Sequence, residues 1–437
     1  MKQMSISLVM YGIKKCSGAC LYCSAASTMD YRDKKNGNRK SFKFDKEKTK
    51  KRILEYTNIE QVLADGDSAE LSIDIWGGNP VENFEEFKET VEFCQKELKE
   101  FQKVKLHTSG NGLELQSDDI VNYLIENDIH YQLSHDGYGQ WLRTGDIDPL
   151  YWDKTKDNIV KLTRLGILDW INTTLNGYNF SFFSNMEFWN KWRRENNLMD
   201  IDTLTIKLNH LYPGTPSVDK EWFGNKDIKG DVWGTKPCKK GQIIGDINLY
   251  GKDLSIYMHE IRKMGIICHT PGIEKSPEWQ PFVSYIMGQV TRWQTLKSEL
   301  DFIGLCRAFQ MGLKDRNFAI DTIGEYSQCN LIDSSTPVKN PSGKRPDECE
   351  TCIYKMQAEC FPCGSEVMPS CEYHYQWCQV LEEFAQLKEL LASLRNENNQ
   401  NHECNCNGDG DGCCGGECSC ESDKNKDAVY CVKNYKL

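Results

Sequence analysis

Two patterns of hydrophobic residues alternate along the N-terminal half of the chain. Apolar residues recur at helical spacing in stretches such as NFEEFKETVEFCQKELKEF (83–101), where Phe84, Phe87, Val91 and Leu98 fall near one face. Between such stretches, short runs rich in apolar, β-branched and aromatic residues predict strands at 5–12, 71–76, 103–108, 130–134, 168–175 and 201–208. Six strand–helix units in series favour parallel strands joined by right-handed crossovers, and therefore a barrel or a doubly wound sheet.

The alternation ends near residue 208. The stretch 209–241 is rich in Gly, Pro and Trp and is expected to be loop, and helices are expected to resume near 252–264 and 280–300. Residues 379–398 carry apolar side chains at helical spacing and predict an amphipathic helix, whereas 398–420 is polar, Gly-rich and low in complexity. The expected organisation is a barrel at 1–208, a connecting region at 209–305, a cysteine-rich domain at 306–397 and a cysteine-rich tail at 398–437.

Composition and charge argue against two classes of partner. The chain of 437 residues lacks an apolar run of the roughly eighteen residues that span a membrane, so no membrane partner is expected. Its net charge of −11 argues against a nucleic-acid partner, which requires a dominant basic face. Residues 32–52 are a local exception, with eleven Lys and Arg against three acids. They form either a solvated loop and helix face or a docking patch for an acidic partner.

Twenty-one cysteines are the most informative feature of the composition. A secreted disulfide-bonded protein of this cysteine density is normally small, whereas this chain is large and opens with a predicted strand instead of a signal peptide. Most of the cysteines fall into three groups along the chain. Clustered thiols in a chain without an export signal usually hold metal, and they predict a cytoplasmic protein.

The first group, in KKCSGACLYCSAAS (14–27), consists of Cys16, Cys20 and Cys23. A four-iron cluster normally takes four thiolates, so three of them can hold the cluster and leave one iron without a protein ligand. An open coordination position is where a metal centre binds and activates another molecule. The alternative for the same loop is a structural zinc site.

The spacing C-x3-C-x2-C after a first strand resembles the cluster-binding motif of the radical S-adenosylmethionine (SAM) superfamily. WGGNP (76–80) is similar to the family's GGEP motif, with Asn79 where Glu is usual, and HTSGNG (107–112) is a weaker match at the third strand end. LSHDGYGQWLR (133–143) is similar to the family's S-x-D-G segment with a following Arg. Beside a [4Fe–4S] cluster on the three cysteines, the resemblance implies SAM contacts at Tyr22, Gly77, Gly78, Asn79, Pro80, Ser134, Asp136 and Arg143.

The resemblance also implies a fold and an activity. The fold is a partial (β/α)6 TIM-like barrel with its active site at the carboxyl ends of the strands. The activity is reductive cleavage of SAM to a 5′-deoxyadenosyl radical, which abstracts hydrogen from a substrate. A flavodoxin- or ferredoxin-type electron donor is the expected redox partner, and the basic stretch 32–52 would attract it.

The second group of cysteines resembles the SPASM domain, which follows radical SAM barrels and holds auxiliary iron–sulfur clusters. GEYSQC (324–329) matches its G-x4-C, and CETCIYKMQAECFPC (349–363) matches its cysteine-rich segment with altered spacing. The resemblance implies one or two auxiliary [4Fe–4S] clusters on Cys306, Cys329, Cys349, Cys352, Cys360, Cys363, Cys371 and Cys378. The pairing it implies puts Cys349, Cys352, Cys360 and Cys378 on one cluster, and Cys306, Cys329 and Cys363 on the other, whose fourth position is either a further ligand or an open site. A zinc ribbon is the alternative.

Many enzymes that combine these two parts modify peptides or proteins, so hydrogen abstraction from a peptide or protein substrate is the preferred function. Only fifteen residues precede Cys16, so no N-terminal peptide-recognition domain is expected, as in sulfatase-maturing enzymes. Those enzymes place an acid before the glycine of G-x4-C, whereas here Ile323 holds that position and Asp321 stands two residues earlier. His135 is either an acid–base group or a structural residue. A small-molecule radical enzyme and a non-catalytic metal-binding protein remain as alternatives.

The third group matches no known pattern and comprises Cys404, Cys406, Cys413, Cys414, Cys418, Cys420 and Cys431. Thiolates favour soft metals. The tail is therefore a metal-scavenging segment, an inert extension, or a tethered substrate or cluster-delivery segment.

Overall fold

The computed structural model describes residues 1–13, 16, 17, 20, 42–145, 147–176, 178–210, 251–298, 319–327 and 368–400. Six parallel strands stand side by side in chain order: β1 (Lys2–Val9), β2 (Ala69–Trp76), β3 (Lys103–Gly110), β4 (Ile129–Ser134), β5 (Leu168–Leu175) and β6 (Thr205–His210). The partial (β/α)6 barrel expected from the sequence is confirmed.

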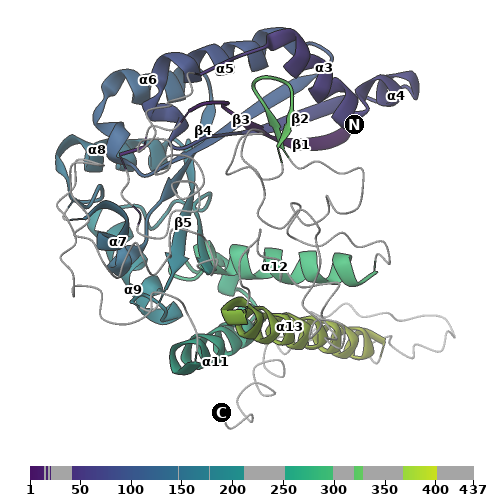
Figure 1. Ribbon diagram of the computed structural model, residues 1–437. Helices are drawn as coiled ribbons and strands as arrows, with labels where there is room; N and C mark the ends of the chain where they lie inside the picture. The colour runs from purple at the N-terminus through teal and green to yellow at the C-terminus, as the bar shows by residue number, and fades with distance from the viewer. Residues whose placement is uncertain are drawn as a thin grey trace, which may run out of the picture. The chain divides into compact units, whose positions relative to one another are not determined.

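Helices connect the strands and lie along the outer side of the curved sheet (Figure 1). They are α3 (Lys46–Thr57), α4 (Ile59–Ala64), α5 (Phe84–Glu97), α6 (Asp118–Glu126), α7 (Trp141–Thr144), α8 (Asp153–Arg164) and α9 (Phe182–Glu195). Among the described residues after β6 there are three further helices, namely α11 (Gly251–Cys268), α12 (Gln280–Ser298) and α13 (Met368–Gln400). Short 3₁₀ turns at Pro80–Glu82, Leu113–Gln116 and Gly137–Gly139 begin the connections after β2, β3 and β4.

The two sides of the sheet differ in polarity. In β2 the buried residues Ala69, Leu71, Ile73 and Ile75 alternate with half-buried Glu70, Ser72, Asp74 and Trp76. Because successive strand residues point to opposite faces, the apolar set packs under the helices and the polar set faces the concave side. The lumen of a closed barrel is normally filled with branched apolar side chains. Here the concave side is lined largely by polar residues, which leaves it suited to binding a ligand.

A short hairpin extends the sheet beyond β1. Strand β7 (Ala319–Asp321) pairs parallel to β1, and β8 (Tyr326–Ser327) pairs antiparallel to β7. Between them Gly324 has φ of +71°, and a Cβ at this position would lie 2.6 Å from the backbone of Lys48 in α3. The hairpin therefore requires glycine here for conformation and for packing. The sequence predicted no strand in this segment, because a run of three residues carries no readable period.

Helix α13 confirms the predicted helix at 379–398 and begins earlier, at Met368. Arg262 of α11 donates to Glu383 of α13 at 2.8 Å, and Gly265 leaves room for the ring of Phe384. The chain divides into two compact units, Met1–Lys388 and Glu389–Leu437. The predicted loop at 209–241 was wrong at its first two residues, which belong to β6, and its other residues lie outside the described ones, as do the tail cysteines. The division at 208, 305 and 397 stays a prediction. None of the described helices is both long enough and apolar enough to cross a membrane.

Candidate active site

Loops that follow β1, β3 and β4 meet at the carboxyl edge of the sheet. The Nδ2 group of Asn111 donates to the Sγ of Cys16 at 3.6 Å. The Nη1 group of Arg143 donates to the Sγ of Cys20, also at 3.6 Å. Parallel strands bring their carboxyl ends to one edge, so motifs distant in the sequence become neighbours. The structure thus brings two of the three predicted cluster ligands together with the predicted SAM-binding segments.

Glu82 anchors the cysteine loop, and the sequence analysis missed it. The backbone N–H of Ser17 donates to both carboxylate oxygens of Glu82, at 2.9 and 2.8 Å, and the Ser17 hydroxyl donates as well. Asn111 and Asn79 add further donors, at 3.4 and 2.9 Å. One carboxylate therefore ties the loop after β1 to the loops after β2 and β3. The one feature of the sequence that indicates this role is that Glu82 lies two residues beyond the GGNP motif.

Asn79 lies at the centre of a buried polar network. Its side chain is 1% exposed, and its Nδ2 donates to Glu82 and to Glu114, each at 2.9 Å. Its Oδ1 accepts no hydrogen bond from the described residues. Glu114 also accepts from the hydroxyl of Tyr131, and burial raises the pKa of Glu114 to about 7. Residue 79 thus offers an unused acceptor, and a carboxylate that titrates near neutrality lies beside it.

The GGNP turn depends on its first two residues being glycine. Gly77 has φ of +132° and Gly78 has φ of +57°, in the region that favours glycine. A Cβ on Gly77 would lie 3.3 Å from the backbone oxygen of Met10. Pro80 then opens the 3₁₀ turn that carries Glu82, where its missing N–H costs nothing. The turn therefore brings the backbone of β2 close to the end of β1.

Asp136 and Arg143 form a buried ion pair, with 2.9 Å between Oδ1 and Nη2. The backbone N–H of Thr174 also donates to Asp136 at 2.9 Å. Burial raises the pKa of Asp136, although the charge of Arg143 opposes that shift. The pair orients the guanidinium toward Cys20. Ser134 is half-buried at the end of β4, opposite Asn172 of β5.

His135 and Asp321 both hydrogen-bond to neighbouring loop residues. The Nδ1 of His135 accepts from the backbone N–H of Gly137 at 3.1 Å, and its Nε2 lies 2.8 Å from Asp148. The ring is fully buried, and burial lowers the pKa of His135, which keeps it neutral. Asp321 accepts from the backbone N–H groups of Ile323 and Glu325 in the β7–β8 turn, so its Oδ1 organises that turn.

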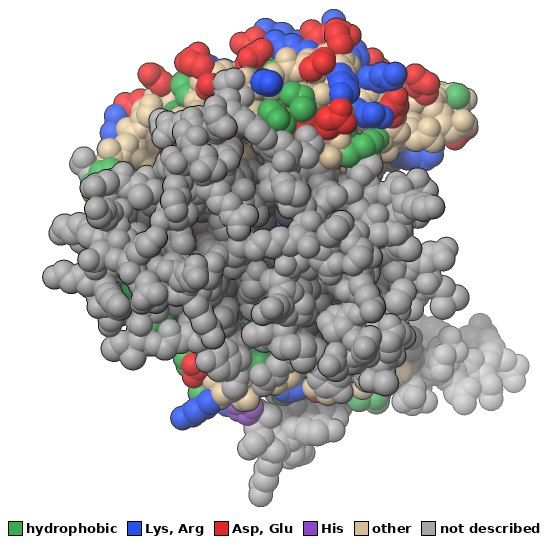
Figure 2. All heavy atoms as spheres, in the orientation of Figure 1, with side chains coloured by type: hydrophobic (Ala, Val, Ile, Leu, Met, Phe, Trp, Pro, Cys, Tyr) green, Lys and Arg blue, Asp and Glu red, His purple; other side chains and the backbone are tan. Residues whose placement is uncertain are grey.

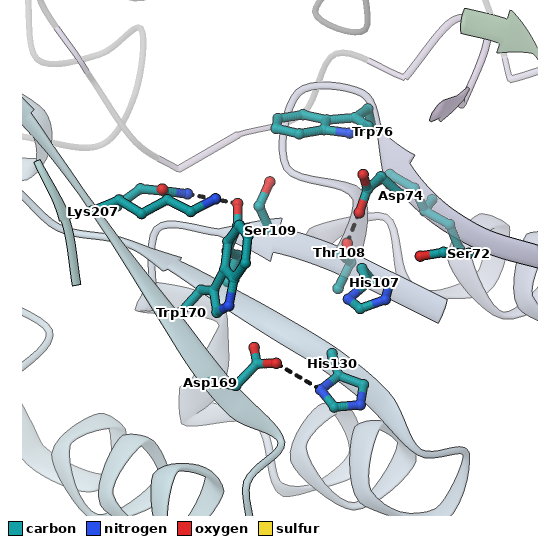
Figure 3. A pocket seen from close by; sticks show the side chains of 13 residues that line it. Ser72, Asp74, Trp76, His107, Thr108, Ser109, His130, Asp169, Trp170 and Lys207 are labelled. Carbon is teal, nitrogen blue, oxygen red and sulfur yellow. Dashed lines mark hydrogen bonds and ion pairs between the residues drawn. The ribbon is translucent and has the colours of Figure 1, made fainter. Parts of the chain in front are cut away.

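A cavity of about 460 Å³ occupies the concave side of the sheet. Its lining comprises Ser72, Asp74, Ile75, Trp76, His107, Thr108, Ser109, His130, Gln132, Asp169, Trp170, Asn172 and Lys207. Figure 3 shows Asp74, His107 and His130 on successive strands, with Asp169 bonded to His130. Asp74 and His107 precede Trp76 and Ser109 by two residues, which places them about 6–7 Å further from the carboxyl edge of the sheet. They therefore form a polar layer deeper in the lumen.

The two imidazoles of this layer have opposite environments. They stack with centroids 5.1 Å apart. The hydrogen bond that His130 makes to the carboxylate of Asp169, at 3.0 Å, raises the pKa of His130. Burial lowers the pKa of His107 and raises the pKa of Asp74, its neighbour across β2 and β3. Among the described residues, no three His, Cys, Asp or Glu side chains come together as a metal site. The layer is therefore suited to hydrogen bonding and proton transfer with a ligand.

In the described part of the basic stretch, residues 42–52, five of the six Lys and Arg side chains pair with acids of the chain. These ion pairs are Lys46–Glu89, Lys48–Glu325, Lys50–Glu100, Lys51–Glu55 and Arg52–Glu55. Figure 2 shows positive and negative side chains mixed over the described surface at the top of the view. The described cations thus favour the solvated helix face over a docking patch.

Several predicted site residues lie outside the described part of the chain. They are Tyr22, Cys23, Cys306, Cys329, Cys349, Cys352, Cys360 and Cys363. Cys371 and Cys378 lie in helix α13, but only the backbone of α13 is described there. The ligand sets of the auxiliary clusters stay predictions.

Comparisons with known proteins define the fold. No protein-family model matches the sequence, and no curated protein matches it. The solved structure of hexahistidine-tagged anSMEcpe with bound AdoMet aligns with a TM-score of 0.50 and 14% identity, over 90% of this chain and 100% of that chain. Native anSMEcpe with bound AdoMet aligns with a TM-score of 0.49 and 15% identity, over 90% and 100% of the two chains. With AdoMet and the Cp18Cys peptide bound, it aligns with a TM-score of 0.49 and 13% identity, over 90% and 99%.

The chain therefore shares the fold of anSMEcpe. The likeness covers 90% of this chain and is one of fold.

Proposed function

We propose that this chain is a radical SAM enzyme that abstracts hydrogen from a peptide or protein substrate. One observation carries the proposal: the segments that match the family's motifs converge at the carboxyl edge of the sheet. Cys16 and Cys20 contact Asn111 and Arg143, and Glu82 joins the cysteine loop to Asn79. A structural zinc loop would give no reason for this convergence.

The residues present fit the implied cofactors. Cys16 and Cys20 are in no disulfide, and with Cys23 they would hold a [4Fe–4S] cluster with one open iron. The buried, unused Oδ1 of Asn79 is an acceptor of the kind that the SAM ammonium group requires. When bound, the cluster and SAM supply a 5′-deoxyadenosyl radical through one-electron reduction.

The chain's own residues position the reactants. Asp136 fixes Arg143 beside Cys20, where the guanidinium places positive charge next to a thiolate ligand. Gly77 and Gly78 allow the backbone to approach closely at the SAM-binding turn. Deeper in the cavity, burial lowers the pKa of His107, so His107 is a candidate proton acceptor. The pKa of His130 is raised by Asp169, so His130 holds its proton more firmly.

The peptide or protein class of substrate rests on the SPASM resemblance, which also supplies one or two auxiliary [4Fe–4S] clusters as part of the proposal. A flavodoxin- or ferredoxin-type protein is the proposed electron donor, and the cytoplasm, where thiols stay reduced, is the proposed location. A small-molecule substrate is the second candidate. The lumen cavity of about 460 Å³ favours it, because pockets of this size enclose small ligands.

Anaerobic reconstitution with iron and sulfide, followed by reduction with dithionite and assay for 5′-deoxyadenosine, tests the proposal. Wild-type protein is expected to form 5′-deoxyadenosine, and the variant with Cys16→Ala, Cys20→Ala and Cys23→Ala is expected to form none. Cys94→Ala is the matched control, because Cys94 is buried in α5 away from the motif. Zinc uptake without SAM cleavage would refute the proposal.

A further inference from the structure

A buried amide joins two carboxylates beside the cysteine loop. Asn79 donates from Nδ2 to Oε1 of Glu82 and to Oε2 of Glu114, at 2.9 Å each. Both bonds use the amide nitrogen, so the amide oxygen remains for another partner. That oxygen accepts no hydrogen bond from any residue in the described part of the chain, although Asn79 is 1% exposed. A buried acceptor without a donor is costly unless a ligand supplies one.

The second carboxylate of this network, Glu114, is poorly compensated when it is ionised. The described side-chain donors that reach it are the amide of Asn79 and the hydroxyl of Tyr131, and both are neutral. Burial, with a smaller contribution from the charge of Glu82, raises the pKa of Glu114 to about 7. A cation bound beside Glu114 would therefore stabilise its ionised form.

We propose that Glu114 and Glu82, aligned by Asn79, supply the negative charge that binds the α-ammonium group of SAM. Position 79 itself lacks the carboxylate that the resembling motif carries, and the acids stand three residues later and in the turn after β3. An ammonium group has three N–H donors. The three side chains here offer one acceptor group for each donor: the amide oxygen of Asn79 and the carboxylates of Glu82 and Glu114. The inference rests on the proposed function, because it requires that SAM binds at this edge.

The test is calorimetric titration of SAM into anaerobically reconstituted, unreduced protein, which measures affinity without turnover. Glu114→Gln preserves size and removes the charge, and it is expected to weaken SAM binding about tenfold or more. A SAM analogue with hydrogen in place of the α-amino group is expected to bind wild type and Glu114→Gln equally. Adding Asn79→Glu to Glu114→Gln returns one carboxylate and is expected to recover most of the affinity.

Glu126→Gln is the matched control, because Glu126 is exposed on α6, and its SAM affinity is expected to equal that of wild type. Unchanged SAM affinity in Glu114→Gln, or equal loss for SAM and the analogue, overturns the inference. If Glu114→Gln does not fold, the single variant Asn79→Glu is the test. SAM binding to Asn79→Glu that is equal to wild type or weaker supports the inference. A tenfold gain overturns it, because an added carboxylate would help only if the wild-type site lacked negative charge. If the wild-type protein binds no SAM, the proposed function is wrong. If wild type binds SAM and Glu114→Gln binds it with the same affinity, only this inference is wrong.

Discussion

His130 and Asp169 form an ion pair between strands β4 and β5, with 3.0 Å between Nδ1 and Oδ2. The register of these strands shifts at this point: Tyr131 pairs with Leu168 and Gln132 pairs with Trp170, so Asp169 is the extra residue. A bulge of this kind redirects a side chain. Here it places a carboxylate next to an imidazole in the lumen, where regular alternation would not.

Replacing this carboxylate is expected to lower the pKa of His130. The hydrogen bond that His130 makes to the Asp169 carboxylate is the main cause of the raised pKa, and Asp169→Asn removes that carboxylate. NMR titration of the histidine ring protons measures the shift, with Asp119→Asn, exposed on α6, as control. Since the folded pKa is raised, the ion pair stabilises the protein below the ordinary His pKa of about 6.5, and this stabilisation is lost as pH rises through the folded pKa. An unshifted titration in Asp169→Asn would contradict the assignment.

Glu114 is expected to make the free energy of unfolding depend on pH. Its pKa is about 7 in the fold against 4.5 as the ordinary value, so the folded state retains a proton that the unfolded state releases. The stabilisation is complete below about pH 4.5 and is lost as pH rises to about 7. The loss amounts to about 3 kcal/mol, as an order of magnitude. Denaturant unfolding at several pH values measures it, and Glu114→Gln is expected to remove this component. Parallel pH profiles in the two proteins would be inconsistent with a buried, titrating Glu114.

Gly77→Ala is expected to destabilise the fold by about 1–3 kcal/mol, because φ is +132° and a Cβ would press on Met10. The matched control is Gly288→Ala in α12, where a Cβ meets open space. That substitution is expected to stabilise the protein by about 0.5–1 kcal/mol, since alanine favours helix. Denaturant unfolding compares the two. Equal effects of the same sign would show that the turn at Gly77 is not constrained.

Glu82→Ala is expected to reduce the iron bound after reconstitution, because it removes the acceptor of the Ser17 backbone N–H in the loop between Cys16 and Cys20. Ser17→Ala is expected to have a smaller effect, since the backbone N–H remains. Glu85→Ala, on the exposed side of α5, is the control. Iron content per chain is the measurement. If Glu82→Ala retains full iron content, the loop does not depend on this anchor.

The fold was predictable from the period of hydrophobic residues along the sequence, but several site residues were not. Alternation of strand and helix patterns identified the six strands β1 to β6 but not β7 and β8, and errors lay at the strand ends: the predicted 201–208 became Thr205–His210. The strand prediction began too early because Ile201 and Leu204 are apolar, yet Ile206 and Leu208 are the residues buried within β6. Apolarity marks burial, and it does not mark where pairing starts.

The cysteine loop and the GGNP turn were predictable because their chemistry is local in sequence. Glu82 and Glu114 were missed, since a single Glu has no pattern and its role depends on loops that only the sheet brings together. Asp169 was missed for a different reason. Its position on the concave side follows from a bulge, which the alternation in LDWINTTL does not reveal.

The polar concave side of the sheet has an evolutionary consequence. Residues such as Ser72, Gln132 and Asn172 contribute little to the hydrophobic core, which lies between the opposite face and the helices. Substitutions among them change the shape and charge of the lumen at small cost in folding free energy. A chain built this way can acquire a new substrate by mutation of its interior without first becoming more stable.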